Sequence, residues 1–155
     1  LKTMPESLLL FINTWNGFRR ITPGSYAPTR AVWGENNRSV ALRIPVSSEE
    51  NRRLEHRIAG ADANPYLVMA ALIQGIVEGI ENEEVPPPPV IGNAYDDGGL
   101  FLPDDMDEAL QLMARSSFVE RALGPLMAKV YQDLKRAEIL AFWAEITQLE
   151  RTTYL

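Results

Sequence analysis

The 155-residue sequence contains no cysteine and a single histidine, His56. The missing thiols exclude disulfide frameworks, thiolate metal sites and cysteine nucleophiles, so any chemistry must use oxygen, nitrogen or cationic side chains. They also leave the redox compartment open, and our expectation is a cytoplasmic location.

Long hydrophobic runs are missing as well. The most apolar stretch is interrupted by Gln74, Gly75 and Glu78, well short of the length that spans a bilayer, so we predict a buried helix and no membrane association. No secretory signal is visible, and because the first residue is Leu1 we expect the chain to be part of a longer protein. The sequence also has no Walker-type phosphate loop, no G-x-S-x-G motif and no dinucleotide fingerprint.

Positive charge is scarce overall but concentrated in the first third of the chain. The formal net charge is -6, yet residues 1–57 carry nine Lys or Arg against five Asp or Glu. The overall charge argues against a general nucleic-acid binder, whose affinity comes from clustered cations that neutralise phosphates. Because nearly all the early cations are arginines, which suit bidentate contact with phosphate or carboxylate, we expect a compact anionic ligand.

Two segments alternate between apolar and polar side chains, which is typical of β-strands. In residues 36–45 the apolar positions alternate with Ala41 and Arg43, so Arg43 should point away from the apolar face. Residues 53–59 alternate again. Proline ends the first of these strands at Pro45.

Helix signals dominate the rest of the chain. Asn64 and Pro65 predict a helix over residues 65–81, because asparagine caps free amides and proline has none to leave unsatisfied. Successive prolines predict a stiff linker over residues 85–90. A loop and then a helical section, residues 104–151, follow. In that section we expect a short helix capped by Asp104 or Asp105. We also expect a turn that is capped by Ser116 or Ser117 and interrupted at Gly124 and Pro125. One long amphipathic helix should then cover residues 126–152.

The motif R-R-L-E-H-R at residues 52–57 places one carboxylate among cations. Side chains two residues apart share a strand face, so Arg53, Glu55 and Arg57 should line one side. One interpretation is a surface ladder of ion pairs, which contribute little. The other is a carboxylate that binds a hard divalent cation while the arginines contact a phosphate. His56 should face the opposite side, so we interpret it as a structural histidine and not as a metal ligand shared with Glu55.

Five arginines between residues 20 and 57 stand at predicted loop mouths or in predicted strands. Each alone is typical of a protein surface, but together they predict a convergent anion site. They are Arg20, Arg38, Arg43, Arg53 and Arg57.

Three motifs, N-G-F-R-R-I-T-P-G-S-Y-A-P (16–28), N-R-S-V-A-L-R-I-P (37–45) and R-R-L-E-H-R with G-A-D-A-N-P-Y-L (52–67), resemble the C-terminal half of the glutamine synthetase family. The resemblance implies an ATP-dependent ligase that joins an amine to the γ-carboxylate of glutamate through γ-glutamyl phosphate. It also implies Mg²⁺ or Mn²⁺ as cofactor and a large ring of identical subunits.

The same resemblance assigns roles by position. It places Glu55 on a metal-binding glutamate, Arg20 and Arg57 on arginines that hold glutamate, and Arg38 on the arginine that meets the transferring phosphoryl group. Arg38, Arg43 and Arg53 fall on nucleotide-phosphate arginines. The whole chain, residues 1–155, then corresponds to the C-terminal part of an α+β catalytic domain, with short antiparallel strands followed by several helices.

Two departures from the family pattern affect the predicted substrate. Where ammonia-using members carry a glutamate in P-G-Y-E-A-P, this sequence has Tyr26, a poor base at neutral pH that could line a wider amine pocket. With P-G-S-Y-A-P, the sequence is most similar to the γ-glutamylpolyamine synthetases, so we expect putrescine or another amine as acceptor. The alternatives are a glutamine synthetase that uses ammonia and a non-catalytic relative.

The second departure is the lack of the family's upstream metal ligands, its N-terminal domain and the first half of its catalytic domain. We therefore expect this piece alone to be inactive. Tyr95 falls near a tyrosine that some bacterial members adenylylate, but the acidic, proline-bearing context that follows it there is missing, so we do not expect that modification here.

Overall fold

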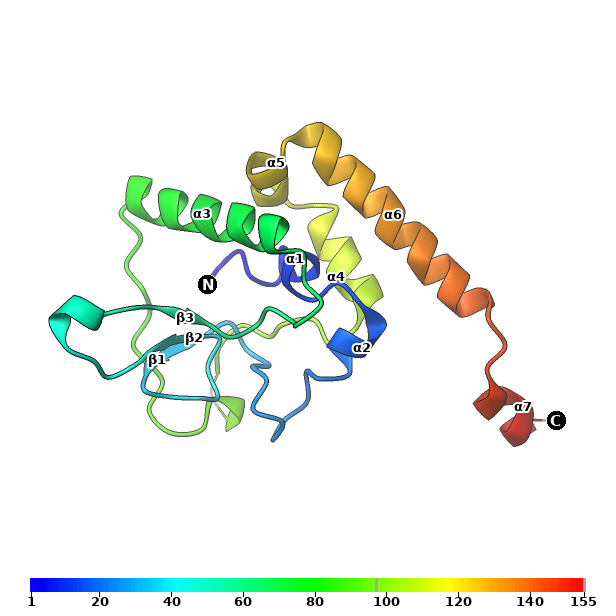
Figure 1. Cartoon of the computed structure of the whole chain (residues 1–155), viewed down its shortest axis with the longest axis horizontal. Helices are drawn as coiled ribbons and strands as arrows, with labels where there is room; N and C mark the ends of the chain where they lie inside the picture. Colours follow the sequence, from blue (N-terminus) through cyan, green and yellow to red (C-terminus); the bar gives the residue numbers. More distant parts are fainter. Residues whose placement is uncertain (97, 155) are drawn as a thin grey trace.

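The computed structural model of the chain describes residues 1–96 and 98–154. Figure 1 shows most of the helices gathered on one side of a small sheet, with the first helix lying between the third and the fourth. In chain order the elements are α1 (Leu8–Phe11), α2 (Trp15–Phe18), β1 (Trp33–Glu35), β2 (Leu42–Ile44), the 3-10 turn η1 (Glu49–Asn51), β3 (Glu55–His56), α3 (Pro65–Glu81), the 3-10 turn η2 (Ala94–Asp96), α4 (Met106–Met113), α5 (Ser117–Leu123), α6 (Pro125–Ala144) and α7 (Gln148–Tyr154).

The sheet has the order β1-β2-β3. The α+β class is confirmed, but antiparallel pairing holds only between β2 and β3, since β1 and β2 run parallel. The segment that connects β1 to β2 folds back and buries Val40 against Val32 and Ala94. Because of this path, β2 runs in the same direction as β1. Both predicted strands are also longer than the observed ones, which cover three and two residues.

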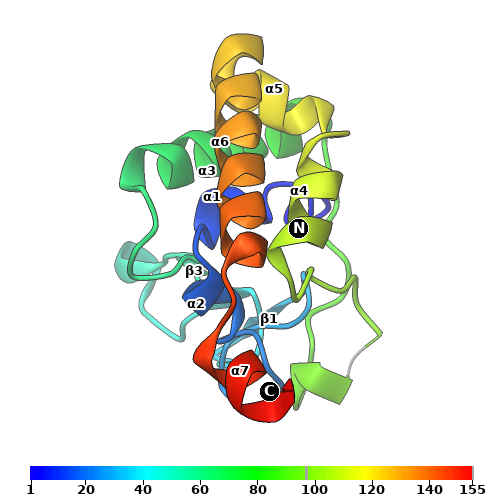
Figure 2. The same cartoon turned by 90° about the vertical axis from the view of Figure 1, so that its right-hand side faces the viewer.

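The core forms around α1. All four of its residues are buried, as expected for a helix that is apolar on every side. Helix α6 crosses this region (Figure 2). It is held there because the Tyr131 hydroxyl donates to the Leu9 carbonyl at 2.7 Å and the Lys135 ammonium donates to the Asn13 carbonyl at 2.8 Å.

Local capping chemistry sets most of the helix starts. Helix α3 covers residues 65–81 with Asn64 as its cap, which confirms the predicted bounds. The prediction that this helix is buried is wrong, because Ala71 is the one buried residue among the described residues of α3. Of the alternatives left open, Asp105 caps α4 and Ser116 caps α5. No helix in the described part of the chain combines the length and hydrophobicity needed to cross a membrane. The predicted loop that precedes α4 contains η2, and its residue 97 lies outside the described residues.

The prediction of one continuous helix over residues 126–152 is wrong. Helix α6 ends at Ala144, and α7 begins at Gln148 after three intervening residues, apart from the body of the molecule (Figure 1). Thr147 and Glu150 form a capping box: the Thr147 hydroxyl accepts from the Glu150 amide at 3.2 Å, and the Glu150 carboxylate accepts from the Thr147 amide at 2.8 Å. The T-Q-L-E sequence carries this signal, so the break could have been predicted.

Candidate active site

Glu55 is held between two arginines at the edge of the sheet. The antiparallel register sets Arg43 directly opposite Glu55, and Arg43 Nη1 donates to Glu55 Oε2 at 2.9 Å. Arg57, two residues after Glu55 in the chain, donates from Nη1 to Glu55 Oε1 at 2.6 Å. The hydrogen bond from Arg57 is the largest of the influences that hold the pKa of Glu55 below its ordinary value of 4.5. Glu55 is therefore a carboxylate at neutral pH, with both of its oxygens in contact with cations.

A cavity of about 270 Å³ opens beside this cluster. Its lining includes Arg20, Tyr26, Glu55 and Arg57, so two segments that are far apart in sequence, within residues 20–27 and 55–57, meet there. Arg20 Nη2 donates to the Ile58 carbonyl at 2.7 Å, which fixes this arginine next to the segment that follows β3. The guanidinium groups of Arg20, Arg43 and Arg57 surround the single carboxylate of Glu55. This excess of positive charge favours an anionic ligand.

The loop that carries Tyr26 closes one side of this cavity. Tyr26 is 70% exposed and has a φ of 60°, a left-handed conformation that is unusual for a bulky residue. Arg57 Nη2 donates to the Tyr26 carbonyl at 3.4 Å. The structure thus brings together the three residues predicted to bind substrate, Arg20, Arg57 and Tyr26, with the predicted metal ligand.

The remaining arginines of the predicted site are arranged differently. Arg43 also donates to the Asn36 side chain at 2.8 Å, a support that strand periodicity could not predict. Arg38 is exposed on a bend, and Arg53 is exposed before β3 begins, where it donates to the Asn51 carbonyl at 3.4 Å. Within the described part of the chain, neither Arg38 nor Arg53 lines the cavity beside Glu55.

The bend around Arg38 is nevertheless firmly attached to a distant segment. Its neighbour Asn37 donates to the Gly92 carbonyl at 2.8 Å, and the Ser39 hydroxyl accepts from the Ala94 amide at 2.9 Å. Sequence reasoning assigned no role to these two side chains. Their positions in the N-R-S motif, on both sides of Arg38, were the available signal.

His56 lies on the opposite side of the strand from Glu55, as strand parity predicts. Its ring packs against Phe11 with 4.5 Å between ring centroids. Burial lowers the pKa of His56 from 6.5 to about 4, so the imidazole is neutral at pH 7. His56 is half-buried, and it is also among the residues that line the cavity beside Glu55.

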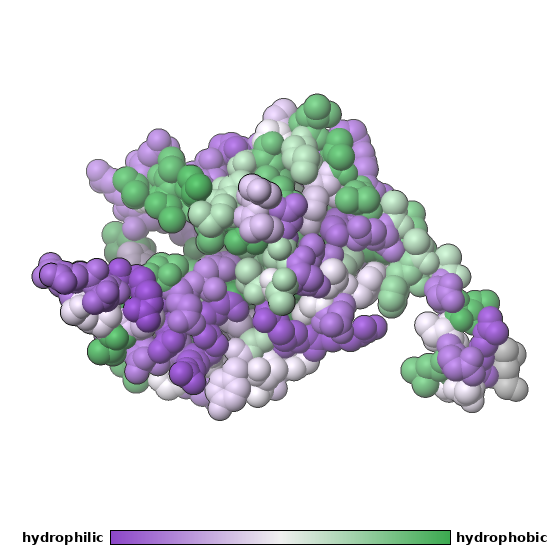
Figure 3. Space-filling model, in the orientation of Figure 1, coloured by the Kyte–Doolittle hydropathy of each residue, from purple (hydrophilic) through white to green (hydrophobic). Residues whose placement is uncertain are grey.

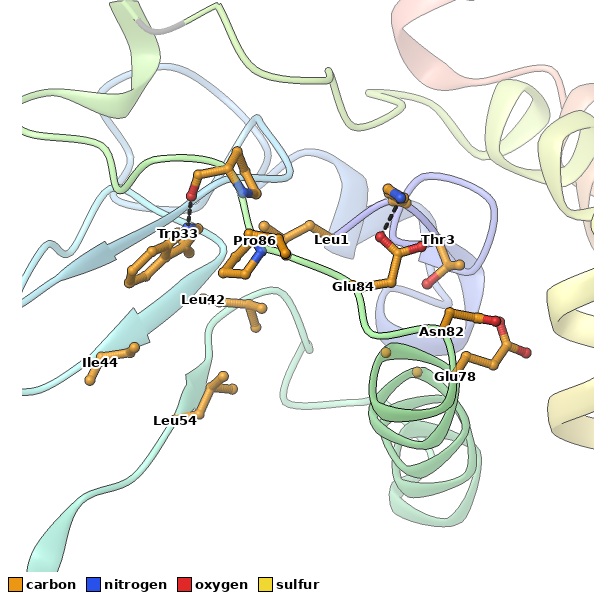
Figure 4. A pocket seen from close by; sticks show the side chains of 15 residues that line it. Leu1, Thr3, Trp33, Leu42, Ile44, Leu54, Glu78, Asn82, Glu84 and Pro86 are labelled. Carbon is orange, nitrogen blue, oxygen red and sulfur yellow. Dashed lines mark hydrogen bonds and ion pairs between the residues drawn. The ribbon is translucent and has the colours of Figure 1, made fainter.

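A larger cavity of about 360 Å³ lies between the other face of the sheet and α3. Figure 4 shows Leu42, Ile44 and Leu54 on the sheet side and Glu78 on α3. The strands therefore separate two environments: Arg43 and Glu55 belong to the ionic side, whereas Leu42, Ile44 and Leu54, which are next to them in sequence, line the apolar cavity. The ionic cavity is the smaller of the two.

Glu55 fits a role as one ligand of a divalent cation. Mg²⁺ is usually bound through one or two protein carboxylates, with phosphate and water oxygens completing the shell. Each carboxylate oxygen of Glu55 accepts one hydrogen bond from an arginine and retains a further lone pair. Within the described part of the chain, Glu55 is the one acidic residue in the cavity lining, so a complete metal site needs further oxygens from outside this set.

Comparison with known proteins identifies the fold and its relatives. The family described as glutamine synthetase, catalytic domain, matches residues 1–154. The chain belongs to the glutamine synthetase family. The γ-glutamylputrescine synthetase PuuA of Escherichia coli is 45% identical over 147 residues, which cover 95% of this chain and 31% of that protein. The family assignment confirms the resemblance carried by the three motifs.

Other members of the glutamine synthetase family are also similar to this chain. The γ-glutamylethanolamide synthetase GlnA4 of Streptomyces coelicolor is 37% identical, over 97% of this chain and 32% of its own length. A solved structure titled "Apo GmaS without ligand" superposes with a TM-score of 0.72 at 26% identity, and it covers 99% of this chain and 38% of that one. The chain thus spans about a third of the length of these curated relatives.

Proposed function

We propose that the full-length protein is an ATP-dependent ligase that joins the γ-carboxylate of glutamate to an amine through γ-glutamyl phosphate. The observation that carries this proposal is the carboxylate of Glu55 bound to Arg43 and Arg57 beside a cavity that Arg20 also lines. Such an arrangement suits phosphoryl transfer, in which catalysis consists mainly of positioning and of neutralising the charge on the phosphoryl group. ATP and Mg²⁺ or Mn²⁺ are the proposed cofactors.

We assign the residues as follows. Arg20 and Arg57 bind the carboxylates of glutamate, and Arg38 contacts the phosphoryl group during transfer. Arg43 and Arg53 bind the nucleotide phosphates, together with Arg38. Glu55 supplies one metal ligand, and a bound divalent cation would neutralise phosphate charge. The exposure of Arg38 and Arg53 leaves both guanidiniums accessible to a nucleotide.

The proposed acceptor is putrescine or another amine larger than ammonia. Support comes from Tyr26, which stands where ammonia-using members carry a glutamate and whose side chain is largely exposed at the cavity. Two of the relatives are named for γ-glutamyl products of larger amines. Glutamine synthetases, including that of Mycobacterium tuberculosis at 34% identity, also match, so ammonia is the competing acceptor.

We propose that residues 1–155 are the C-terminal part of the catalytic domain and are inactive alone. Glu55 is one carboxylate in a cavity that requires further metal ligands, and the relatives are about three times as long. Because its substrates would be ATP and glutamate, we place the full-length protein in the cytoplasm.

A ring of identical subunits is the proposed assembly. The outward face of α3 carries apolar side chains at alternating spacings of three and four residues, and each is more than half exposed in this chain. Figure 3 shows hydrophobic surface in the region of α3. Such surfaces usually lie against other protein, either the rest of the chain or a second subunit. These residues are Tyr66, Met69, Ile73, Ile76 and Ile80.

The decisive experiment measures phosphate release by the full-length protein with ATP, glutamate and a panel of amines. We expect turnover that requires glutamate and is at least tenfold higher with putrescine or another amine than with ammonia at equal concentration. Higher turnover with ammonia would identify a glutamine synthetase. No glutamate-dependent turnover with any amine would identify a non-catalytic relative and refute the proposal.

A further inference from the structure

Two consecutive carbonyl groups of the loop that carries Tyr26 are held by residues from distant segments. The Tyr26 carbonyl accepts from Arg57 Nη2 at 3.4 Å, and the next carbonyl, that of Ala27, accepts from the Tyr95 hydroxyl at 3.0 Å. Ala27 is buried and Tyr95 is half-buried, so the shorter contact is sheltered from water. Tyr95 therefore joins η2 to a loop 68 residues earlier in the sequence.

This pair of contacts surrounds an unfavourable backbone conformation. Tyr26 has a φ of 60°, which L-residues with bulky side chains rarely adopt. Such conformations persist where the surrounding structure enforces them. Because the Tyr26 side chain is 70% exposed, its own packing supplies little of that restraint. Hydrogen bonds from the Ser25 hydroxyl to the Arg20 and Thr22 carbonyls stabilise the start of the loop, and Arg57 and Tyr95 hold its end.

Tyr95 can act in this way because η2 is itself fixed. The Ala94 amide donates to the Ser39 hydroxyl at 2.9 Å, and the Gly92 carbonyl accepts from the Asn37 side chain at 2.8 Å. The segment that ends at Tyr95 is thus bound to the bend that carries Arg38. It connects the proposed phosphoryl-binding bend with the loop on the proposed acceptor side.

We infer that Tyr95 is a positioning residue that holds the Tyr26 loop in the geometry needed to bind the acceptor amine. The inference rests on the proposed function for the identity of the ligand, but the contact between Tyr95 and Ala27 stands independently of it. Because the Tyr95 hydroxyl is bonded to a backbone carbonyl, Tyr95 takes no direct part in the chemistry. Its loss should weaken binding of the amine and leave binding of glutamate and ATP intact.

The test uses the full-length protein with Tyr95→Phe, which removes only the hydroxyl. Hydrogen exchange is followed by mass spectrometry in peptides that cover the loop, residues 22–28, and α3. We expect the exchange rate of the loop amides to rise about fivefold, because loss of one ordinary hydrogen bond changes the opening equilibrium by about this factor. The exchange rate of the α3 amides should stay unchanged. Tyr154→Phe is the matched control, because Tyr154 is 81% exposed, and it should leave loop exchange at the wild-type rate.

Steady-state kinetics supply the second readout. We expect Tyr95→Phe to raise the KM for the amine about fivefold while kcat and the KM for glutamate change less than twofold. Loop exchange at the wild-type rate, or an equal rise throughout the chain, would overturn the inference, because the first shows no restraint and the second shows general destabilisation. A faster loop with an unchanged amine KM would overturn the functional role. If the wild-type protein shows no amine-dependent turnover, the proposed function fails, and loop exchange alone decides whether Tyr95 positions the loop.

Discussion

Replacing Glu55 with glutamine removes the charge at the centre of the candidate site and preserves the shape of the side chain. Glu55 accepts one hydrogen bond on each oxygen, from Arg43 at 2.9 Å and from Arg57 at 2.6 Å. Glutamine has a single acceptor oxygen, so it can satisfy one arginine but must present its amide hydrogens to the other. The change therefore breaks one charge-assisted bond and juxtaposes two donors.

The size of the effect follows from this geometry. A hydrogen bond to a charged group contributes about 1.5–3 kcal/mol. The Glu55 side chain is 34% exposed, so solvent reduces that contribution, and we expect Glu55→Gln to lower the free energy of unfolding by about 1 kcal/mol. The loss of activity should be far larger. Because the proposed metal ligand loses its charge, we expect turnover of the full-length enzyme to fall by about 100-fold or more.

Glu78→Gln is a matched control for this variant. Glu78 also has a lowered pKa and both of its oxygens bonded to an arginine, at 2.6 and 3.1 Å from Arg121, but it lies on α3 outside the arginine-lined cavity. Urea unfolding should report a comparable loss of stability for both variants. Amine-dependent ATP turnover should remain within about twofold of wild type for Glu78→Gln. Near wild-type turnover of Glu55→Gln, or an equal loss in both variants, would refute the assignment of Glu55.

Two further predictions concern the core. Burial lowers the pKa of His56 from 6.5 to about 4, so the contribution of the neutral imidazole to the free energy of unfolding is complete above pH 6.5 and falls by up to about 3 kcal/mol as the pH drops toward 4. His56→Leu should flatten this pH dependence in urea unfolding measured between pH 7 and 4.5. Equal slopes of unfolding free energy against pH for the variant and the wild type would contradict the prediction. Tyr131→Phe leaves the buried Leu9 carbonyl without its donor, so the free energy of unfolding should fall by about 1–3 kcal/mol. The control Tyr154→Phe, at an exposed position, should lower it by about 0.5 kcal/mol or less. Equal losses in the two variants would show that the buried hydrogen bond contributes little.

The features predicted well are those that depend on neighbours in sequence. Asn64 and Pro65 start α3 because a capping side chain needs only the amides of the next turn. Alternation along the strand separates Glu55 and Arg57 from His56 because successive side chains point to opposite faces. The break before α7 depends on equally local chemistry, so missing it was an error of interpretation and not a lack of information.

The direction of strand pairing could not be predicted in the same way. Whether β1 runs parallel to β2 depends on the path of the chain between them, where Val40 is buried against Ala94 from a segment more than fifty residues away. Arg53 shows the same limit. Periodicity places it on the face of Glu55, but the strand begins after it, and its side chain is exposed.

The amino-acid sequence was therefore sufficient for the helix caps, for the two faces of R-R-L-E-H-R and, through its motifs, for the family. It could not show that Arg43 and Arg57 occupy the two oxygens of Glu55, or that Tyr95 holds the loop of Tyr26. The first group of features depends on contacts within a few residues, which the period of a strand or the first turn of a helix dictates. The second depends on strand register and on contacts across long stretches of chain, which exist only after the core around α1 has brought those segments together.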